Sequence, residues 1–488
     1  MKNDNKLTAN GNGKGTALVS KASGDRSKFL GLGLGGFFVI LAFAAPHGAV
    51  FTKEMSSTLF LIIAALSMWI SGCIPIIASS LIIIALMPLV GIKPSLAAAL
   101  NGFTNTSSYF VIASIALGLA ITKTSIPSKL LSAMLRWSKG KVSKILLAFM
   151  SLSYLISMWV SDIGAVVLAL SFVTSFTGMI NTDTKSGKNL VTMLALSAPI
   201  GSVLGGNSLV VGSSVNIVTL NMLANHSGRT ITFLEWLIMG LPACLVTLLI
   251  IWRVLLVIFK TDDLKEADTN AYALQLKGQK SKLQYEGITI TVILMIMFTW
   301  FASSWIKGLD VTTIGIFGMA FLFMPRFGAL TWNEFRAGMS WEVPYMGACS
   351  IALGEAVREV GLAMLMSTKL AELFPNVGPV GMVFVFSVAM TVLVMGIPVG
   401  PAMASMMTVP AYVLAETVGL NPMANVMVVG IFAANSCILP LNATFLIPYS
   451  RGLFKISDCA KAGVCLSLIW IVVCSVWLPI TTSWLYPM

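Results

Sequence analysis

Residues 204–216 decide the fold, because this polar stretch interrupts an apolar segment that runs from 190 to 225. The stretch reads Leu204-Gly205-Gly206-Asn207-Ser208-Leu209-Val210-Val211-Gly212-Ser213-Ser214-Val215-Asn216. A helix that stops inside a membrane leaves terminal N–H and C=O groups without partners, which is costly in hydrocarbon unless water, an ion or a polar ligand is present. The break therefore predicts a ligand site. The alternative is that Gly205, Gly206 and Gly212 only permit close packing between helices.

The composition around this segment indicates a polytopic membrane protein. The chain has 488 residues, of which 57% are hydrophobic and 10% charged, whereas soluble proteins carry about 25% charged residues. The net charge of +12 comes from residues between apolar segments, where it sets topology, so nucleic acid is not an expected partner. The seven cysteines lie in or beside apolar segments without metal-ligand spacing, which predicts neither a disulfide framework nor a metal site.

Hydropathy and breaks predict an all-α membrane fold with about 11 transmembrane helices and two re-entrant hairpins. The expected hairpins are 145–180 and 378–412, and the expected broken segments are 190–225 and 424–449. The other expected helices are 29–48, 57–73, 75–91, 107–122, 233–258, 286–306, 311–325, 344–360 and 463–485. The domains expected are a polar tail over 1–28, a first membrane repeat over 29–259, a cytosolic loop over 260–285 and a second membrane repeat over 286–488.

The distribution of basic residues supports this topology. If both hairpins return to their own side and the tail is cytosolic, 24 of the 31 Lys and Arg residues fall in cytosolic loops, as the positive-inside rule requires. The expected location is a cell membrane, specifically a bacterial inner membrane, with the N-terminus in the cytosol and the C-terminus outside. An open alternative is that the basic lead and the apolar run from Phe29 to Ala45 form a cleavable signal peptide.

The chain also contains an internal repeat. The sequence Ser-Ile-Ala-Leu-Gly occurs at 114–118 and again at 350–354. Each copy precedes a short amphipathic stretch, an apolar hairpin and a broken segment. In the predicted topology the two copies cross the membrane in opposite directions, an arrangement typical of secondary transporters whose site lies near the bilayer midplane.

The chain resembles the divalent anion/sodium symporter family, from about Leu59 to the C-terminus. Residues 204–216 are similar to the family's Gly-Gly-x-x-Thr-x-x-Gly-x-x-x-Asn loop, and residues 159–164 stand where the family has a Trp-x-Ser-Asn-Thr hairpin tip. Ile438-Leu439-Pro440, followed by Arg451-Gly452, resembles the matching second-half segment. The resemblance implies two inverted repeats with two re-entrant hairpins, a homodimer in the lipid bilayer, and transport of di- or tricarboxylates or sulfate.

The resemblance also implies the site residues, although the motifs depart from the family's pattern. The first tip has Ser161-Asp162-Ile163, and the second has Gly400-Pro401-Ala402, in place of Ser-Asn-Thr. The expected substrate-binding residues are Ser161, Asp162, Gly206, Asn207, Ser208, Gly400, Pro401, Ala402, Asn442 and Thr444. The expected cation-binding residues are Ser157, Ser161, Asp162, Gly205 and Gly206. Because the second tip has no side-chain donor, at most one sodium site is expected, in the first half.

Asp162 carries the most specific functional hypothesis. A carboxylate within a membrane is costly unless it is paired, protonated or beside a cation. Ser157 precedes Ser161 by one turn, so the two hydroxyls and Asp162 could surround a hard cation, which prefers oxygen ligands. Asp162 could instead carry a proton, contact the substrate, or cap the following helix segment. A second intramembrane charge group, Glu355, Arg358 and Glu359, is interpreted first as a salt bridge on one helix face.

These features predict a secondary active transporter of a small anion, foremost a di- or tricarboxylate, that works by alternating access with sodium or proton coupling. The alternatives are a cation/proton exchanger or oxyanion exporter of the same superfamily and, from another class, a non-transporting membrane sensor. An enzyme is not expected, because no nucleophile, base and orienting group can be assembled at one membrane depth. No cofactor beyond a coupling sodium ion or proton is expected.

Overall fold

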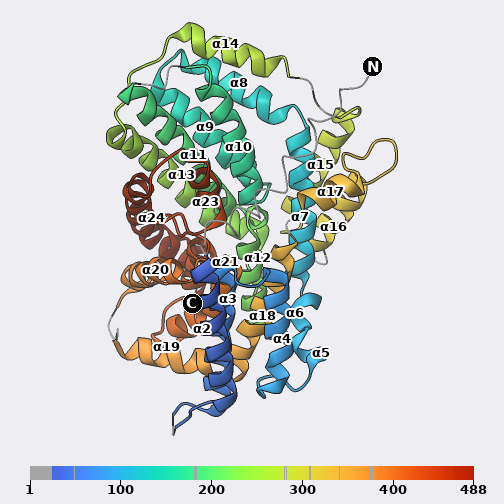
Figure 1. The fold of residues 1–488 in the computed structure, drawn as a ribbon, viewed down its shortest axis with the longest axis vertical. Coiled ribbons are helices and arrows are strands. Elements are labelled where there is room, and N and C mark those ends of the chain that lie inside the picture. The colour runs from blue at the N-terminus through green and yellow to red at the C-terminus, as the bar shows by residue number, and fades with distance from the viewer. Residues whose placement is uncertain are drawn as a thin grey trace. The chain divides into compact units, whose positions relative to one another are not determined.

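The computed structural model describes residues 25–487 except 49, 181–183, 280, 282, 307–308, 340 and 374–376. All regular elements in these residues are helices (Figure 1), which confirms the all-α fold class. Most of the tail predicted over 1–28 lies outside the described residues. The chain forms two compact units, Met1–Thr104 with Trp332–Leu362 (unit 1) and Asn105–Thr331 with Ala363–Met488 (unit 2).

Unit 1 is built around the helices α3 and α18. Helix α2 packs along α3, and α18 packs against α4 and α6. The helices of unit 1 are α2 (Asp25–Ala44), α3 (Lys53–Ser71), α4 (Ile76–Leu89), α5 (Leu96–Ala99), α6 (Asn101–Thr104), α17 (Trp332–Gly338) and α18 (Glu342–Glu359). Gly102 on α6 lies directly against the backbone carbonyl of Ala348 on α18, so a side chain there would force the two helices apart.

Unit 2 contains both hairpins and both broken segments. Its first part has α7 (Thr106–Lys123), α8 (Ile126–Ser138), α9 (Val142–Ser157), α10 (Asp162–Thr177), α11 (Lys185–Ser208), η1 (Val210–Gly212), α12 (Ser214–Ser227) and α13 (Phe233–Ile258). Its later part has α14 (Glu266–Lys277), α15 (Glu286–Ala302), α16 (Val311–Leu322), α19 (Leu362–Leu373, whose first residue is assigned to unit 1), α20 (Pro379–Gly396), α21 (Gly400–Thr417), α22 (Pro422–Phe432), α23 (Ala443–Ser450) and α24 (Ile456–Leu485).

Local capping explains where several of these helices begin. Thr232 and Glu235 form a capping box at the start of α13, with the Thr232 backbone N–H donating to Glu235 Oε2 at 2.7 Å. Thr184 accepts from the backbone N–H of Gly187 at 3.0 Å and so caps α11. Asn421 accepts from the N–H of Met423 at 3.0 Å before α22. Each cap satisfies an N–H group that the helix itself leaves without a partner.

Five helices in the described residues are long and apolar enough to cross a membrane, and a sixth span results if α7 and α8, bent by 58°, are counted as one. The five are α3, α11, α13, α20 and α24. Shorter apolar helices include both arms of the first hairpin, α9 and α10. This pattern is that of a multi-pass membrane protein.

The order of elements repeats along the chain. The first series consists of the helices α7 and α8, the hairpin α9–α10, the broken segment α11–η1–α12 and the long helix α13. The second series has the same order: the helices α18 and α19, the hairpin α20–α21, the broken segment α22–α23 and the long helix α24. The two copies of the Ser-Ile-Ala-Leu-Gly sequence lie inside α7 and α18. The elements therefore follow the predicted order, while the inversion of one repeat relative to the other stays a prediction.

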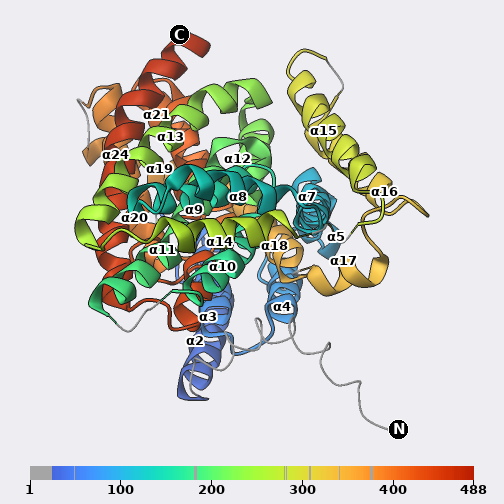
Figure 2. The same ribbon diagram turned by 90° about the horizontal axis from the view of Figure 1, so that it is seen from above.

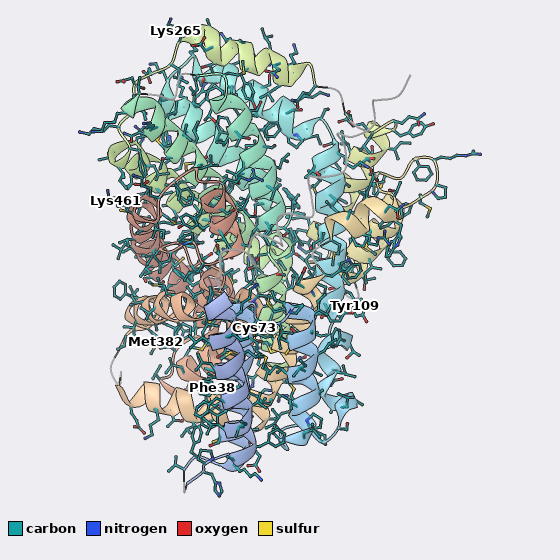
Figure 3. All side chains as sticks on the ribbon, viewed as in Figure 1. Phe38, Cys73, Tyr109, Lys265, Met382 and Lys461 are labelled. Atoms are coloured by element: carbon teal, nitrogen blue, oxygen red, sulfur yellow. The ribbon has the colours of Figure 1, made fainter. Side chains whose placement is uncertain are left out.

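The polar loop expected over 260–285 contains a helix, α14, which lies alongside α8 (Figure 2). The Tyr272 hydroxyl donates to the Phe172 carbonyl at 3.0 Å, and the Ser132 hydroxyl donates to the Ala273 carbonyl at 2.6 Å. Lys265 at the start of α14 and Lys461 on α24 are exposed (Figure 3). The segment is thus a docked helix with a polar outer face, which hydropathy alone describes only as a loop.

Candidate functional site

The tip of the first hairpin brings together the three predicted cation-binding residues of that segment. Helix α9 ends at Ser157 and α10 begins at Asp162, with Ser161 in the N-cap position. The Ser157 hydroxyl, which is fully buried, donates to Asp162 Oδ1 at 2.9 Å. Asp162 is therefore the first residue of α10 rather than its N-cap, and its carboxyl group lies at the positive end of the α10 dipole.

The break between α11 and α12 lies directly against this tip. A Cβ atom on Gly206 would overlap Asp162 Oδ1, so the backbone of α11 approaches the carboxylate as closely as a residue without a side chain permits. A Cβ atom on Gly212 would lie 2.8 Å from the Ser157 carbonyl oxygen. Both positions need glycine because two segments meet there without space for a side chain.

Two serines that were not among the predicted site residues complete the surroundings of Asp162. The Ser202 hydroxyl donates to the Asp162 backbone carbonyl at 2.7 Å and lies 3.2 Å from the Ser157 hydroxyl. Ser213, in the N-cap position of α12, is buried and directly follows Gly212, which meets the Ser157 carbonyl. Ser202 could have been found from the sequence, because it precedes Gly206 by four residues and so lies on the same face of α11.

The carbonyl end of α11 is held by side chains from two other helices. The Asn216 amide donates to the carbonyl oxygens of Gly206 at 2.9 Å and Leu209 at 2.8 Å. The Trp236 indole N–H donates to the Asn207 carbonyl at 3.1 Å. Among the described residues, Asn207 Oδ1 and Asn216 Oδ1 are buried acceptors without a hydrogen-bond partner. Buried oxygens of this kind are suitable ligands for a hard cation.

Two other predicted residues of this segment contact α9 instead of Asp162. A Cβ atom on Gly205 would overlap the Tyr154 carbonyl, so Gly205 permits close packing between α11 and α9. The Ser208 hydroxyl donates to the Leu204 carbonyl at 2.8 Å and lies 2.7 Å from the Tyr154 hydroxyl. Gly205 thus permits close packing between helices, as the packing interpretation expects, whereas Gly206 meets the Asp162 side chain, and a ligand site there stays a prediction.

The second hairpin tip packs closely and without polar side chains. Gly400 begins α21, and a Cβ atom there would lie 2.7 Å from Val215 Cγ2 on α12 and 3.1 Å from Ala434 Cβ. Pro401 and Ala402 follow in the buried first turn of α21. The second tip therefore reaches the start of α12, and the N-termini of α12 and α21 lie together.

The predicted pair in the second broken segment performs local capping. Asn442 Oδ1 accepts from the Phe445 backbone N–H at 3.1 Å and from the Thr444 hydroxyl at 2.7 Å. The Asn442 amide also donates to the Ala434 carbonyl at 2.7 Å, which joins the start of α23 to the residue that contacts Gly400. Asn442 and Thr444 thus shape the second tip through Ala434.

The second break also contains polar atoms that were not predicted from the sequence. Asn435 Oδ1 and the Ser436 hydroxyl are buried and, within the described part of the chain, have no hydrogen-bond partner. They follow α22 directly and precede α23. Their positions resemble those of Asn207 and Asn216 in one respect, because each pair lies at a break in a helix and has buried oxygen atoms without a partner among the described residues.

The charge group predicted around Arg358 has a different pairing in unit 1. Lys93 Nζ lies 2.8 Å from Glu359 Oε2 and 3.6 Å from Glu355 Oε2, and its side chain is 3% exposed. Arg358 lies 3.9 Å from Glu359. Glu355 therefore pairs with the buried Lys93 and not, as the sequence had suggested, with Arg358.

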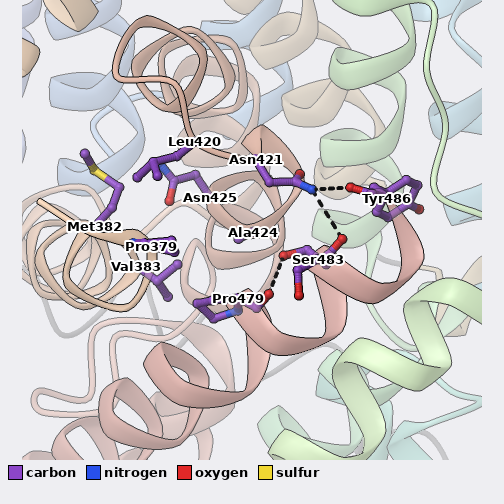
Figure 4. Close-up of a pocket in the computed structure, with 11 residues that line it drawn as sticks. Pro379, Met382, Val383, Leu420, Asn421, Ala424, Asn425, Pro479, Ser483 and Tyr486 are labelled. Carbon is purple, nitrogen blue, oxygen red and sulfur yellow. Dashed lines mark hydrogen bonds between the residues drawn. The ribbon is translucent and has the colours of Figure 1, made fainter. Parts of the chain in front are cut away.

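A separate cavity of about 100 Å³ opens between the ends of α20, α22 and α24 (Figure 4). Its lining combines apolar side chains, such as those of Met382, Val383 and Pro479, with polar residues that include Asn421 and Asn425. The Asn421 amide in this lining donates to the carbonyl oxygens of Thr482 and Tyr486 (Figure 4). The cavity contains none of the predicted site residues.

The helical spans and broken helices around a polar centre define the class of the protein as a polytopic membrane transporter. Residues 27–488 match the family model described as the transmembrane region of sodium:sulfate symporters. Because the match covers nearly the whole chain, the protein belongs to this family, and it is a secondary transporter rather than an enzyme.

Curated relatives carry a more specific description. The sodium-dependent dicarboxylate transporter SdcS of Staphylococcus saprophyticus is 25% identical over 434 residues, which cover 83% of this chain and 82% of the relative. SdcS of Staphylococcus aureus strain RF122 is 25% identical over 471 residues, covering 91% and 89%. The solved structure of the Alcanivorax borkumensis YdaH transporter aligns with a TM-score of 0.48 and 13% identity, covering 79% of this chain and 88% of that one.

Proposed function

We propose that this protein transports a dicarboxylate across the membrane and couples that transport to a single cation, sodium or a proton, at Asp162. The observation that carries the proposal is the contact of the Asp162 carboxylate with Ser157 and with the helix break at Gly206. The relatives named above are described as sodium-dependent dicarboxylate transporters, which supports the substrate class and the use of a cation.

The charge balance supports coupling at this residue. A dianion that enters a site beside an ionised carboxylate is repelled strongly, because the effective dielectric constant is low away from bulk water. A sodium ion or a proton on Asp162 cancels that repulsion. Ser157 and the oxygen atoms of Asn207 and Asn216 could supply additional ligands for sodium, which prefers oxygen. The cation therefore has to be present for the anion to bind.

Two helix N-termini supply the attractive part of the anion site. Helices α12 and α21 have 14 and 18 residues, and Gly400 at the start of α21 contacts Val215 in the first turn of α12. The N-terminus of a helix carries a partial positive charge and free N–H groups that suit a carboxylate. The second tip, Gly400-Pro401-Ala402, offers no side-chain oxygen, so we place the coupling cation in the first half alone.

We further propose the membrane arrangement that the charge distribution favours. The two repeats are inverted relative to each other, both hairpins are re-entrant, and the N-terminus lies in the cytosol of a bacterial cell while the C-terminus lies outside. Two copies of the chain associate as a homodimer in the bilayer. Alternating access then moves the site of unit 2 between the two sides of the membrane.

Uptake measurements on the purified protein in liposomes test this function. We expect uptake of labelled dicarboxylates, such as succinate, that rises when an inward gradient of sodium or of protons is imposed. Sulfate and a tricarboxylate serve as competitors that define the substrate class. Protein-dependent uptake of sulfate but of no dicarboxylate would contradict the substrate assignment. Dicarboxylate uptake that responds to neither gradient would contradict the coupling.

A further inference from the structure

The side chain of Trp236 on α13 is fully buried and reaches the carbonyl end of the first broken helix. Its indole N–H donates to the Asn207 carbonyl at 3.1 Å, in the last turn of α11. Terminal carbonyls of a helix have no partner within the helix. Trp236 therefore satisfies one such carbonyl at the position where the chain leaves α11 and enters the break.

The benzene ring of the same indole contacts a helix of the second half. A Cβ atom on Gly430 would lie 2.5 Å from Cη2 and 3.3 Å from Cζ2 of Trp236, so the ring lies directly against the backbone of α22. Helix α22 ends two residues later, at Phe432, just before the buried Asn435 and Ser436. One rigid side chain thus spans from the break after α11 to the last turn before the break after α22.

We propose that Trp236 is a positioning residue that couples the two helix breaks, so that a shift of α22 at Gly430 moves the Asn207 carbonyl and changes substrate affinity. This inference rests on the proposed transport function for its effect on uptake. Its structural part, the mechanical link between Gly430 and the end of α11, is independent of which substrate the protein carries.

A double-mutant cycle separates this link from ordinary packing. Trp236→Phe removes the N–H donor and the distal ring atoms that contact Gly430. Gly430→Ala places a methyl group against those atoms and displaces the indole, while alanine itself suits a helix. In the Trp236→Phe background the same methyl group has room, so Gly430→Ala should have no further effect there. Trp300→Phe is the matched control, because Trp300 is equally buried and its N–H donates to the Val311 carbonyl at 2.9 Å, away from either break.

In dicarboxylate uptake, Trp236→Phe and Gly430→Ala should each raise the half-saturating substrate concentration about tenfold, as expected for one buried hydrogen bond lost. The maximal rate per inserted protein should stay close to that of the parent. A residue with only a structural role would instead lower the amount of inserted protein and the maximal rate. Trp300→Phe should leave the half-saturating concentration unchanged.

A second measurement does not require transport. The Cys244 side chain on α13 is fully buried, and α13 packs against α11, so the reaction of this thiol with N-ethylmaleimide reports opening of the packing around the break. In a protein that retains Cys244 as its single cysteine, both single variants should react several-fold faster than the parent, and the double variant no faster than Trp236→Phe. Gly430→Ala that acts equally in both backgrounds, or that leaves Cys244 labelling unchanged, would overturn the link. Faster Cys244 labelling in a protein without dicarboxylate uptake would instead reject the proposed function and retain the link.

Discussion

Replacing Gly206 by alanine tests the closest contact in the site. A Cβ atom at this position would overlap Asp162 Oδ1 and would lie 3.2 Å from the Gly212 carbonyl oxygen. The carboxylate has to move, because the alternative is to separate two segments of backbone. Moving it breaks the hydrogen bond of 2.9 Å from Ser157 and removes Asp162 from the cation position that we propose.

The expected magnitude follows from that hydrogen bond. A hydrogen bond to a charged group contributes about 1.5–3 kcal/mol, and each 1.4 kcal/mol corresponds to a factor of about 10 in affinity. Gly206→Ala should therefore raise the half-saturating concentration of the coupling cation by about 10–100-fold. Gly206→Val should abolish uptake, because a branched side chain adds a second clash and disfavours the bend.

Uptake by liposomes at graded cation concentrations measures this effect, with protein insertion quantified in the same vesicles. Gly396→Ala is the matched control, because Gly396 ends α20 close to the other hairpin tip and a Cβ atom there would meet no atom within 4 Å. It should behave like the parent. A Gly206→Ala protein with unchanged cation dependence would refute the placement of the cation beside Asp162, and normal uptake by Gly206→Val would remove the site from this break.

Three further predictions concern topology, the second tip and unit 1. Lys139 and Lys188 flank the first hairpin, and single cysteines that replace them should both resist an impermeant thiol reagent added outside intact cells. Fast labelling of only one of the two cysteines would mean that the segment between them crosses the membrane. Asn442→Ala removes the cap of α23 and the donor to the Ala434 carbonyl. It should lower the free energy of unfolding by about 1–2 kcal/mol and reduce substrate affinity. Asn442→Asp keeps the cap and should restore the stability of α23. Lys93→Met should lower the melting temperature of the detergent-solubilised protein, because it leaves the partly buried Glu355 without its partner. The control Lys369→Met removes an exposed pair with Glu372 and should change the melting temperature little. Equal shifts of the melting temperature in the two variants would contradict the importance of burial.

The order of the helices was predictable from the sequence because each span is marked by hydropathy and each break by glycine or proline. The contact between Asp162 and the Gly206 segment was also foreseeable, since a carboxylate and a broken helix both need polar surroundings inside a membrane. Helix α14 was not, because its position depends on tertiary hydrogen bonds such as that from Tyr272 to Phe172. The partner of Glu359 was missed for the same reason, as Lys93 lies 266 residues away in the chain.

The functions of the two glycines at 205 and 206 could not be separated from the sequence. Both are adjacent in the same motif, yet one faces the α9 backbone at Tyr154 and the other faces Asp162. Successive helical residues point about 100° apart, so only the rotation of α11 in its packed position decides which of them meets the site. That rotation is set by packing against α9 and α13 and not by the motif itself.

The central claim is that a cation on Asp162 couples transport, and Asp162→Asn tests it most directly. Asparagine retains the shape of the side chain and can still accept from Ser157, but it cannot be ionised and attracts a cation less strongly. Uptake of dicarboxylate would be measured in liposomes with imposed sodium and proton gradients, for the parent and the variant inserted at equal amounts. We predict that the variant still binds the anion and that its uptake loses most of its response to the gradient that drives the parent. Uptake by the Asn variant that keeps the parent's dependence on pH and sodium would show that Asp162 only stabilises the start of α10 and would contradict the account.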